Sequence, residues 1–250
     1  KPFTEFANVG WLITLVYMTE IRRALQQRDQ ALHFISHDIR APNASILTLL
    51  EMQRNSMEPL QADELLKRIE KYAQASLSMA ESFVRLASAQ SNEYRVAPLD
   101  LASVLQDAVD DAWTQASNQE VSVTILQIPH SAPCVGDRPL LARAMANVLN
   151  NAIKYSPARG TVRCSLYARG PNWIISVRDE GPGIDPPQQD RLFKPFSRLH
   201  DLTHPNISGV GLGLALVHTV VKRHGGSLEL ESAVGQGAEF RLVLPASASD

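Results

Sequence analysis

The N-terminal third of the chain carries an apolar seam with alternating spacings of four and three residues. The seam begins at Ile21, is interrupted at Arg28, contains Pro42 and ends at Leu49. This heptad-like pattern predicts one long helix packed in a bundle, with a kink at the proline. After a break at residues 55–59, a second seam predicts another amphipathic helix, and its members are Leu66, Ile69, Ala73, Ala80, Phe83 and Ala87. Because a single αα-hairpin buries only part of its apolar surface, we expect a four-helix bundle made by dimerisation.

A different pattern follows residues 92–98, where the seam stops and Pro98 marks a linker. Helical periodicity now alternates with strand periodicity. The pattern predicts helices over 99–113, 137–155 and 212–224, and strands over 121–128, 161–168, 173–179, 227–232 and 239–244. Such a mixture is typical of an α/β sandwich with helices on one face of the sheet. The fold class we expect is α+β, with an N-terminal helical hairpin and a C-terminal sandwich.

Composition narrows the range of functions only slightly. At 250 residues the chain is long enough for two modest domains, and its net charge of −2 gives no electrostatic reason to expect nucleic acid as a partner. Cys134 and Cys164 stand apart without a CxxC motif, so we expect them to be buried and reduced.

The segment Val9 to Met18 is apolar but shorter than the roughly 20 residues that a membrane span needs. Two interpretations stay open: the trimmed end of a transmembrane helix, or an apolar helix that leads into a dimer. Arg22 and Arg23 would suit the cytoplasmic flank of a span. Because the sequence lacks an initiator Met, we expect it to be a fragment of a longer protein.

His37 lies between the seam residues Ile35 and Ile39, so helical geometry turns its side chain toward solvent. The adjacent Asp38 can accept a hydrogen bond from Nδ1 and leave Nε2 as a nucleophile, while Arg40 adds positive charge nearby. By itself, a His-Asp pair is more often an inert pair on a helix surface. Its interpretation depends on what lies downstream.

Polar side chains also recur on one face of the helix expected over 137–155. Asn147, Asn151 and Lys154 are spaced by four and three residues. An amide oxygen can bind Mg²⁺ and an ammonium can neutralise phosphate, although a solvated helix face would look similar. This face is therefore a candidate for binding a phosphorylated ligand.

Asp179 ends a strand on the same side as Trp173, Ile175 and Val177, which directs its carboxylate toward apolar surroundings where it needs a donor. The following glycines, Gly181 and Gly183, suit a tight turn close to a flat ligand. The exocyclic amine of adenine would supply such a donor. An ordinary Asp-Gly turn after a strand is the alternative.

A glycine-rich segment, Gly209 to Leu214, precedes the last predicted helix, and backbone at a helix N-terminus favours phosphate. It matches neither a dinucleotide fingerprint nor a P-loop. The preceding residues 186–208 lack regular patterning, which is typical of a lid. Lys194 and Arg198 in this loop could reach phosphates, or they could be solvated loop charges.

Taken together, these segments resemble the sensor histidine kinases of bacterial two-component systems, whose ATP-binding domain belongs to the Bergerat superfamily with gyrase and related ATPases. FISHDIRAP resembles the H-box, NVLNNAIKYS the N-box, DEGPGI the first glycine box, RLFKPFSRL the phenylalanine box and GVGLGLAL the second glycine box. The resemblance covers residues 21–245. One box can arise by chance, whereas five in this order essentially cannot.

The resemblance implies that His37 accepts the γ-phosphoryl group of ATP while Asp38 orients the imidazole. It also implies that the adenine contacts Asp179, that a phosphate contacts Arg198 and that Asn151 holds Mg²⁺. The full set of implied ATP-binding residues is Asn147, Asn151, Lys154, Tyr155, Asp179, Gly181, Gly183, Arg198, Gly209, Gly211, Leu212 and Gly213.

The resemblance further implies an enzyme that works as a homodimer and passes the phosphoryl group to an aspartate of a response regulator receiver domain. Residues 1–20 would be a signalling helix or the end of a transmembrane segment, residues 21–92 the dimerisation and histidine phosphotransfer domain, and residues 99–246 the ATP-binding domain. We expect a cytoplasmic fragment of an inner-membrane sensor, joined to the membrane through an upstream region.

Two departures from the family pattern stand out. Ala41, four residues after His37, replaces the Thr or Asn that is common there and that helps to dephosphorylate the regulator, so we expect weak phosphatase activity or a different route. Ala238 replaces a usual Thr, a change we expect to be minor. Two other functions stay open: a Bergerat-type ATPase that hydrolyses its nucleotide, and a catalytically silent dimerisation and signalling module.

Overall fold

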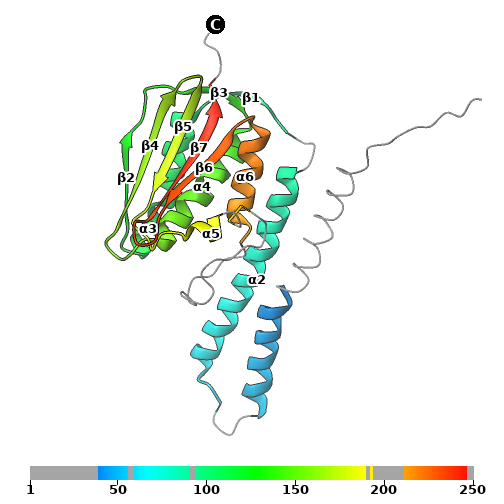
Figure 1. The fold of residues 1–250 in the computed structure, drawn as a ribbon. Coiled ribbons are helices and arrows are strands. Elements are labelled where there is room, and N and C mark those ends of the chain that lie inside the picture. The colour runs from blue at the N-terminus through cyan, green and yellow to red at the C-terminus, as the bar shows by residue number, and fades with distance from the viewer. Residues whose placement is uncertain (1–38, 56–58, 91–93, 190–191, 194–210, 247–250) are drawn as a thin grey trace, which may run out of the picture.

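The computed structural model describes residues 39–55, 59–90, 94–189, 192–193 and 211–246. Residues 39–55 form a helix that runs alongside α2 (Ala62–Gln90), and together they make a helical hairpin (Figure 1). The Gln53 side chain closes this hairpin, because its amide donates to the Leu60 carbonyl and accepts from the Leu60 N–H, both at 2.9 Å. The predicted αα-hairpin is therefore confirmed over the described residues.

The first predicted seam agrees with burial in its described part, since Pro42 is buried and Ile46 and Leu49 are half-buried. The second seam is only partly buried within one chain. Ile69 and Ala80 are half-buried like the neighbouring Leu65, whereas Leu66 and Ala73 are exposed. The reason is that α2 carries two apolar stripes, and periodicity alone does not show which one packs within the hairpin.

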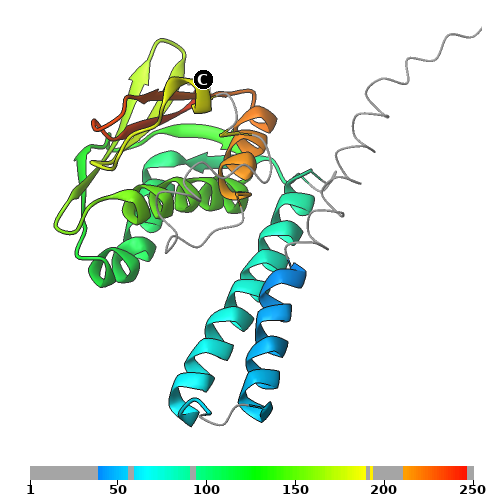
Figure 2. The same cartoon turned by 60° about the horizontal axis from the view of Figure 1, so that its bottom comes forward.

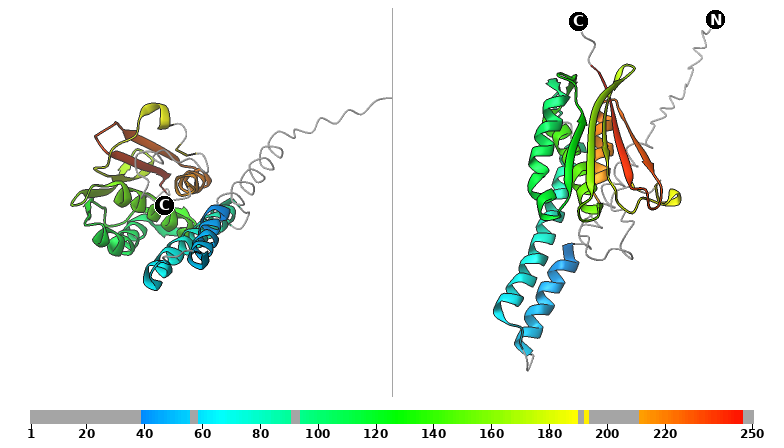
Figure 3. Two further views of the ribbon diagram at one scale, coloured as in Figure 1. Left: turned by 90° about the horizontal axis from the view of Figure 1, so that it is seen from below. Right: turned by 90° about the vertical axis from the view of Figure 1, so that its left-hand side faces the viewer.

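The C-terminal part contains a five-stranded sheet with helices on one face, together with a separate two-stranded sheet (Figure 3). The sheet order is β2-β4-β5-β7-β6, in which β2 and β4 are parallel and the other neighbours antiparallel. In chain order the elements are β1 (Ala97–Asp100), α3 (Leu101–Asn118), β2 (Ser122–Gln127), β3 (Pro133–Gly136), α4 (Arg138–Tyr155), β4 (Thr161–Arg169), β5 (Asn172–Arg178), α5 (Pro186–Gln189), α6 (Gly213–Arg223), β6 (Ser227–Ser232) and β7 (Ala238–Pro245). The predicted α+β class and the single-sided sandwich are confirmed.

Three local predictions were wrong. Residues 97–100 form β1, which pairs antiparallel with β3, instead of linker and the start of a helix. The helix starts at Leu101 because Asp100 Oδ1 accepts the Ala102 N–H at 2.9 Å and caps it. The loop predicted from 186 begins with the short helix α5. A strand four residues long that pairs with a segment about 35 residues away leaves no periodic signal.

The core lies between the helices and the inner face of the sheet. Leu105, Leu149, Ile175 and Leu242 belong to it, with no exposed side-chain surface. Both cysteines are buried as free thiols, as predicted. Burial raises the pKa of the Cys164 thiol to about 12, so this thiol is inert at neutral pH.

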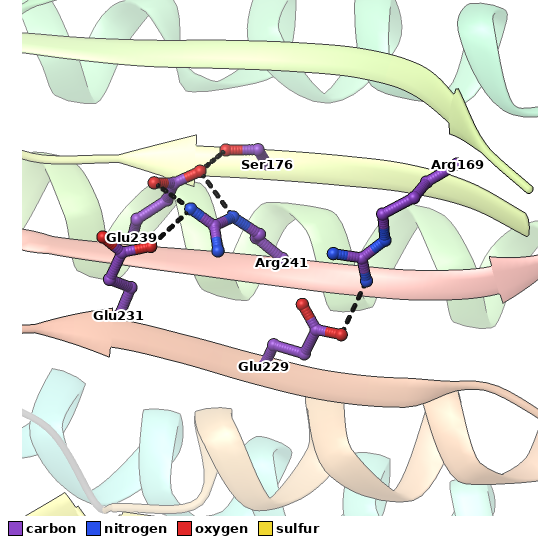
Figure 4. Close-up of polar contacts among 6 residues, drawn as sticks. All are labelled: Arg169, Ser176, Glu229, Glu231, Glu239 and Arg241. Atoms are coloured by element: carbon purple, nitrogen blue, oxygen red, sulfur yellow. Dashed lines mark hydrogen bonds and ion pairs between the residues drawn. The ribbon is translucent and has the colours of Figure 1, made fainter.

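The outer face of the sheet carries a group of paired charges (Figure 4). Glu239 accepts hydrogen bonds from the Ser176 hydroxyl at 2.6 Å and from Arg241 at 2.7 and 2.8 Å. Arg241 also reaches Glu231 at 2.6 Å, and Arg169 pairs with Glu229 at 2.6 Å. These side chains therefore already pair with one another.

The hairpin extends from the helical side of the sandwich, where α2 contacts α6 (Figure 2). Within the part of the chain that the structure describes, no helix is both long and apolar enough to cross a bilayer. The two interpretations of residues 9–18 concern a segment that lies outside the described residues.

Candidate functional site

Helix α4 forms the floor of the candidate site. Asp137 caps it by accepting the Leu140 N–H on Oδ1 at 3.1 Å. Val148, Leu149, Ala152 and Ile153 are buried on the face toward the core, while the other face carries the half-buried residues Asn147, Asn151 and Lys154. The predicted division of this helix into an apolar and a polar face is confirmed.

The start of α6 packs directly on this polar face. A Cβ added at Gly213, the first residue of α6, would lie 3.0 Å from Asn147 Oδ1. The Asn147 amide is held in place because its Nδ2 donates to the Arg143 carbonyl at 2.9 Å. Gly213 thus brings the N-terminus of α6, whose first backbone N–H groups have no partner within the helix, against the face of α4 that carries Asn147 and Asn151.

The two residues before α6 contribute differently. Gly211 has a φ of +71°, a conformation that favours glycine and redirects the chain into the helix. The Leu212 side chain is 2% exposed and belongs to the core. A ligand can therefore meet Leu212 only through its backbone.

Asp179 follows β5 and is 5% exposed, in line with the predicted inward parity. Its Oδ1 accepts two backbone N–H groups, from Gly181 at 2.8 Å and from Ala238 at 3.1 Å. Burial raises the pKa of this carboxyl, and the two backbone donors oppose that rise only in part. Among the described residues no donor reaches Oδ2, so one oxygen of a rigidly held carboxyl remains for a ligand.

The glycines after Asp179 allow two close approaches. A Cβ at Gly181 would lie 2.7 Å from the Tyr155 carbonyl oxygen, so this segment packs against the C-terminal end of α4. Gly183 has a φ of +72°, and a Cβ there would lie 1.9 Å from the Ala233 carbonyl oxygen. Gly183 therefore allows close packing against the β6–β7 loop.

The sequence interpretation missed the segment that anchors Asp179 from the other side. Gly237 has no room for a side chain, since a Cβ would lie 2.1 Å from the Asp179 carbonyl oxygen. Ser232 Oγ accepts the Ile184 N–H at 2.9 Å and donates to the Gly237 carbonyl at 2.7 Å. The glycines of this segment were visible in the sequence, but the hydrogen bonds that join it to Asp179 span 59 residues: the Asp179 N–H donates to the Ala238 carbonyl, and the Ala238 N–H donates to Asp179 Oδ1.

Comparison with known proteins identifies the family to which these segments belong. The family of histidine kinase-, DNA gyrase B- and HSP90-like ATPases matches residues 136–248. The mycobacterial sensor histidine kinase MprB, a solved structure, is 33% identical over a match that covers 61% of this chain and 98% of that one, with a TM-score of 0.52. The chain belongs to the sensor histidine kinases of two-component systems.

Two curated relatives match this chain beyond the ATPase domain. The adaptive-response sensory kinase SasA of Synechocystis sp. is 28% identical, covering 96% of this chain and 68% of SasA. The sensor-like histidine kinase SenX3 of Mycolicibacterium smegmatis is 33% identical, covering 84% of this chain and 56% of SenX3. The chain therefore spans between about half and two thirds of these curated relatives. Histidine kinase ThkA, solved in complex with response regulator TrrA, shares the fold with a TM-score of 0.74 at 18% identity, covering 92% of this chain and 65% of that one.

Several residues predicted for this kinase site lie outside the described residues, namely His37, Asp38, Arg198 and Gly209. The contacts described above bring five of the predicted residues into one region: Asn147, Tyr155, Asp179, Gly181 and Gly213. Lys154 Nζ lies 5.4 Å from the centroid of the Tyr155 ring at the end of α4. Asn151 is half-buried one turn after Asn147.

The side chains of this site fit a Mg²⁺ ion that binds together with a nucleotide. Among the described residues, no three His, Cys, Asp or Glu side chains gather in a group able to hold a metal ion. The Asn151 amide can supply one neutral oxygen, which suits Mg²⁺ only if phosphate and water supply most of the other ligands. This is the usual arrangement for Mg²⁺ bound together with a nucleotide.

Proposed function

We propose that this chain is the catalytic core of a sensor histidine kinase that phosphorylates itself on His37 from Mg-ATP. In this proposal residues 21–92 form the dimerisation and phosphotransfer domain, and residues 99–246 form the ATP-binding domain. The phosphoryl group then passes to an aspartate of a response regulator receiver domain. Residues 1–20 would lead to an upstream sensor region at the inner membrane, which makes the chain a cytoplasmic fragment.

One observation carries the proposal: the two glycine segments converge on α4. Gly181 abuts the carbonyl of Tyr155, and Gly213 abuts the amide of Asn147. Beside Gly181 lies the buried carboxyl of Asp179, whose Oδ1 accepts two backbone N–H groups. A site with a buried acceptor at one end and helix N-terminal N–H groups at the other fits a ligand with an amine at one end and phosphates at the other.

In this site, Asp179 Oδ2 accepts a hydrogen bond from the adenine amine. The phosphates lie toward the start of α6 and the polar face of α4, where Lys154 neutralises charge. The backbone at Gly211 and Gly213 would face the phosphates, and Gly209 and Arg198 are the further residues that we propose to bind them. A bound Mg²⁺, held through Asn151, would neutralise phosphate charge and orient the terminal group.

His37 acts as the nucleophile and Asp38 orients its imidazole by accepting the Nδ1 proton, so that Nε2 faces the γ-phosphate. The bond from γ-phosphorus to the bridging oxygen breaks as the Nε2–phosphorus bond forms, and ADP leaves. Catalysis is then mainly positioning and charge neutralisation. The ATP-binding domain brings the nucleotide to His37 by moving about the linker that precedes β1.

A second copy of the chain is the proposed partner of the hairpin. On α2, Leu66, Ala73, Leu77 and Val84 are exposed and recur at spacings of seven, four and seven, so they share one face. Three of these side chains are at least 60% exposed. An apolar stripe of this kind, next to a stripe already packed in the hairpin, supports a four-helix bundle formed by two chains.

The response regulator is the proposed acceptor because this chain shares its fold with ThkA, which was solved in complex with the response regulator TrrA. Incubation of the labelled kinase with a receiver domain and Mg²⁺ should move the label to the receiver. A receiver in which the acceptor aspartate is replaced by asparagine is the matched control. Retention of all label on the kinase with every receiver tested would reject the transfer step.

The kinase assignment itself is tested with γ-labelled ATP. The wild type should acquire a label that is acid-labile and base-stable, as expected for phosphohistidine, and His37→Gln and Asp179→Asn should not. His130→Gln changes an exposed histidine of the loop before β3 and should label like the wild type. Label that persists in His37→Gln would refute the acceptor.

The alternative of a hydrolysing Bergerat-type ATPase has less support. Those enzymes place a catalytic glutamate in the helix that corresponds to α4, and α4 contains no Asp or Glu. Release of phosphate into solution that equals ATP consumption, with no protein-bound label, would favour this alternative. ATP that binds without either product would point to the catalytically silent module.

We also propose that phosphatase activity toward the regulator is weak. Ala41 is exposed in the first helix, and its carbonyl accepts the Ser45 hydroxyl at 3.1 Å, so its methyl group offers nothing to orient water. Phosphorylated regulator incubated with the kinase and ADP should lose phosphate slowly, whereas Ala41→Thr should accelerate the loss. Rapid dephosphorylation by the wild type that does not depend on His37 would contradict this expectation.

A further inference from the structure

The linker that follows α2 is attached to the ATP-binding domain by two described residues. The Arg95 N–H donates to Asp137 Oδ2 at 3.1 Å. The Tyr94 ring meets the His224 ring edge-to-face, with centroids 5.1 Å apart and an interplanar angle of 85°. The Arg223 guanidinium lies 4.8 Å from the Tyr94 centroid on the same helix end. The first residues after the phosphotransfer domain are thus held by side chains of α4's cap and α6's cap.

His224 joins these two helix caps. Its Nε2 accepts the Asp137 N–H at 3.0 Å, and its Nδ1 lies 2.7 Å from the Val220 carbonyl oxygen. This pattern defines a neutral ring with its proton on Nδ1. The ring is 8% exposed, and a Cβ at Gly136 would lie 2.5 Å from its Cδ2, so only glycine lets the histidine approach β3 so closely.

The same two helices hold the candidate nucleotide site at their other parts. Asp137 caps α4, which carries Asn147 and Asn151 along its length, and His224 caps α6, which begins at Gly213. A helix transmits a displacement of its end along its axis because its backbone is hydrogen-bonded throughout. The linker clasp, defined as Tyr94, Arg95, Asp137 and His224, therefore connects the linker to the nucleotide site through two rigid elements.

We propose that His224 is a positioning residue that couples the linker to nucleotide binding, an inference that rests on the proposed function of the site. When the clasp is closed, α4 and α6 have the spacing that the nucleotide requires. When it opens, the linker is free to swing and the nucleotide is bound less tightly. Coupling of this kind is reciprocal: the factor by which nucleotide closes the clasp equals the factor by which clasp opening weakens nucleotide.

The charges around His224 oppose one another. Burial is the largest influence and lowers the pKa of His224, the Val220 carbonyl and the Asp137 carboxylate raise it, and Arg223 lowers it, so that the net shift is downward and favours the neutral ring. Tyr94 faces the ring from the linker and is uncharged, since its pKa is raised. A proton on Nε2 would leave no acceptor for the Asp137 N–H, so the closed clasp requires neutral His224.

The coupling is tested on the whole chain by hydrogen exchange of the Arg95 and Asp137 amides, with AMP-PNP as the probe. Saturating AMP-PNP should slow exchange of both amides by about five-fold or more in the wild type. Tyr94→Ala removes the ring contact from a half-buried position and should abolish this slowing. Tyr94→Phe keeps the aromatic ring, so AMP-PNP should still slow exchange in this variant. It should also do so in His130→Gln. Equal slowing in the wild type and Tyr94→Ala would overturn the proposal.

Because the coupling is reciprocal, AMP-PNP affinity gives a second test, with a result that is not expected if the clasp only supports the fold. Tyr94→Ala should weaken AMP-PNP binding by the same factor by which AMP-PNP slows wild-type exchange, again about five-fold or more. His224→Gln, which can still accept the Asp137 N–H, should recover part of the coupling that His224→Ala loses. If Tyr94→Ala weakened AMP-PNP binding but AMP-PNP did not slow amide exchange in the wild type by the same factor, the clasp would be only a packing contact and the proposal would be rejected.

These outcomes are separate from those of the kinase assignment. Exchange and AMP-PNP binding need no phosphoryl transfer. A wild-type chain that shows the coupling but acquires no label would reject the kinase activity and support the clasp. A wild-type chain that is labelled on His37, while AMP-PNP leaves exchange of the Arg95 amide unchanged, would support the kinase activity and reject the clasp.

Discussion

The substitution Asp179→Asn separates the binding role of this side chain from its structural role. Asp179 Oδ1 accepts the Gly181 and Ala238 N–H groups, and an asparagine carbonyl oxygen can accept both in the same place. The substitution therefore changes only the second atom, from an acceptor oxygen to a donor amide. That atom is the one that we assign to the adenine amine.

The magnitude follows from these contacts. A hydrogen bond to a charged acceptor contributes about 1.5–3 kcal/mol, which corresponds to ATP binding weakened about 10- to 150-fold. The free energy of unfolding should change by less than about 1 kcal/mol, because removing a buried charge offsets the weaker bonds to the backbone. Asp179→Ala instead leaves two buried N–H groups without an acceptor and should cost about 2–5 kcal/mol of stability.

Isothermal titration with ATP and urea unfolding of both variants make the test. Asp179→Asn should unfold like the wild type and bind ATP weakly, while Asp179→Ala should be impaired in both. The asparagine amide can donate to the 6-oxo group of guanine, so the ratio of GTP to ATP affinity should rise in Asp179→Asn alone. A stable Asp179→Asn protein with unchanged ATP affinity would refute the assignment of Oδ2 to adenine.

Three further predictions address other parts of the chain. Gly183→Ala should lower the free energy of unfolding by about 2–4 kcal/mol in urea titrations, because the new methyl would meet the Ala233 carbonyl at a φ that disfavours it. Leu77→Glu, at a position 61% exposed, should shift the chain from dimer to monomer in sedimentation velocity. Burial lowers the pKa of His224, so its contribution to the free energy of unfolding should be complete above about pH 6.5 and should fall by about 1.4 kcal/mol for each pH unit between the unfolded-state and folded-state pKa values.

Each of these has a matched control. Gly170→Ala has the same sign of φ but nothing within 4 Å of the new methyl, so it should cost only about 1 kcal/mol. Leu126→Glu, on β2 and 62% exposed, should leave the dimer intact. His224→Gln should flatten the stability curve between pH 7.5 and 5.5, whereas His130→Gln should not. A pH dependence that survives in His224→Gln would assign it to other groups.

The sign of that pH dependence follows from proton counts. Below its ordinary pKa the His224 side chain binds a proton in the unfolded chain before it does so in the folded chain. Unfolding therefore takes up protons, and acid favours it. Above that pKa both states are neutral and the contribution is complete and constant.

Local patterning predicted most of the ATP-binding domain because its long elements bury one face each. Asp137 as a cap, the two faces of α4 and the inward parity of Asp179 could all be read from spacing. The short strands β1 and β3 could not, since each depends on pairing with a segment that is remote in sequence. On α2, spacing showed an apolar helix but not which of its two stripes packs in the hairpin.

The sequence by itself determined the local features of the candidate site: the order of the boxes, the asparagines on one helix face and the glycines beside Asp179. Those features are local, because side-chain type and helical or strand period act over a few residues. Only the tertiary structure decided which glycines exist for packing, what holds Asp179 and where the linker attaches. Each of these rests on contact between segments far apart in the chain, such as Asp179 with Ala238 and Asp137 with His224. Such contacts arise when hydrophobic burial brings the elements together, and no period in the sequence records them.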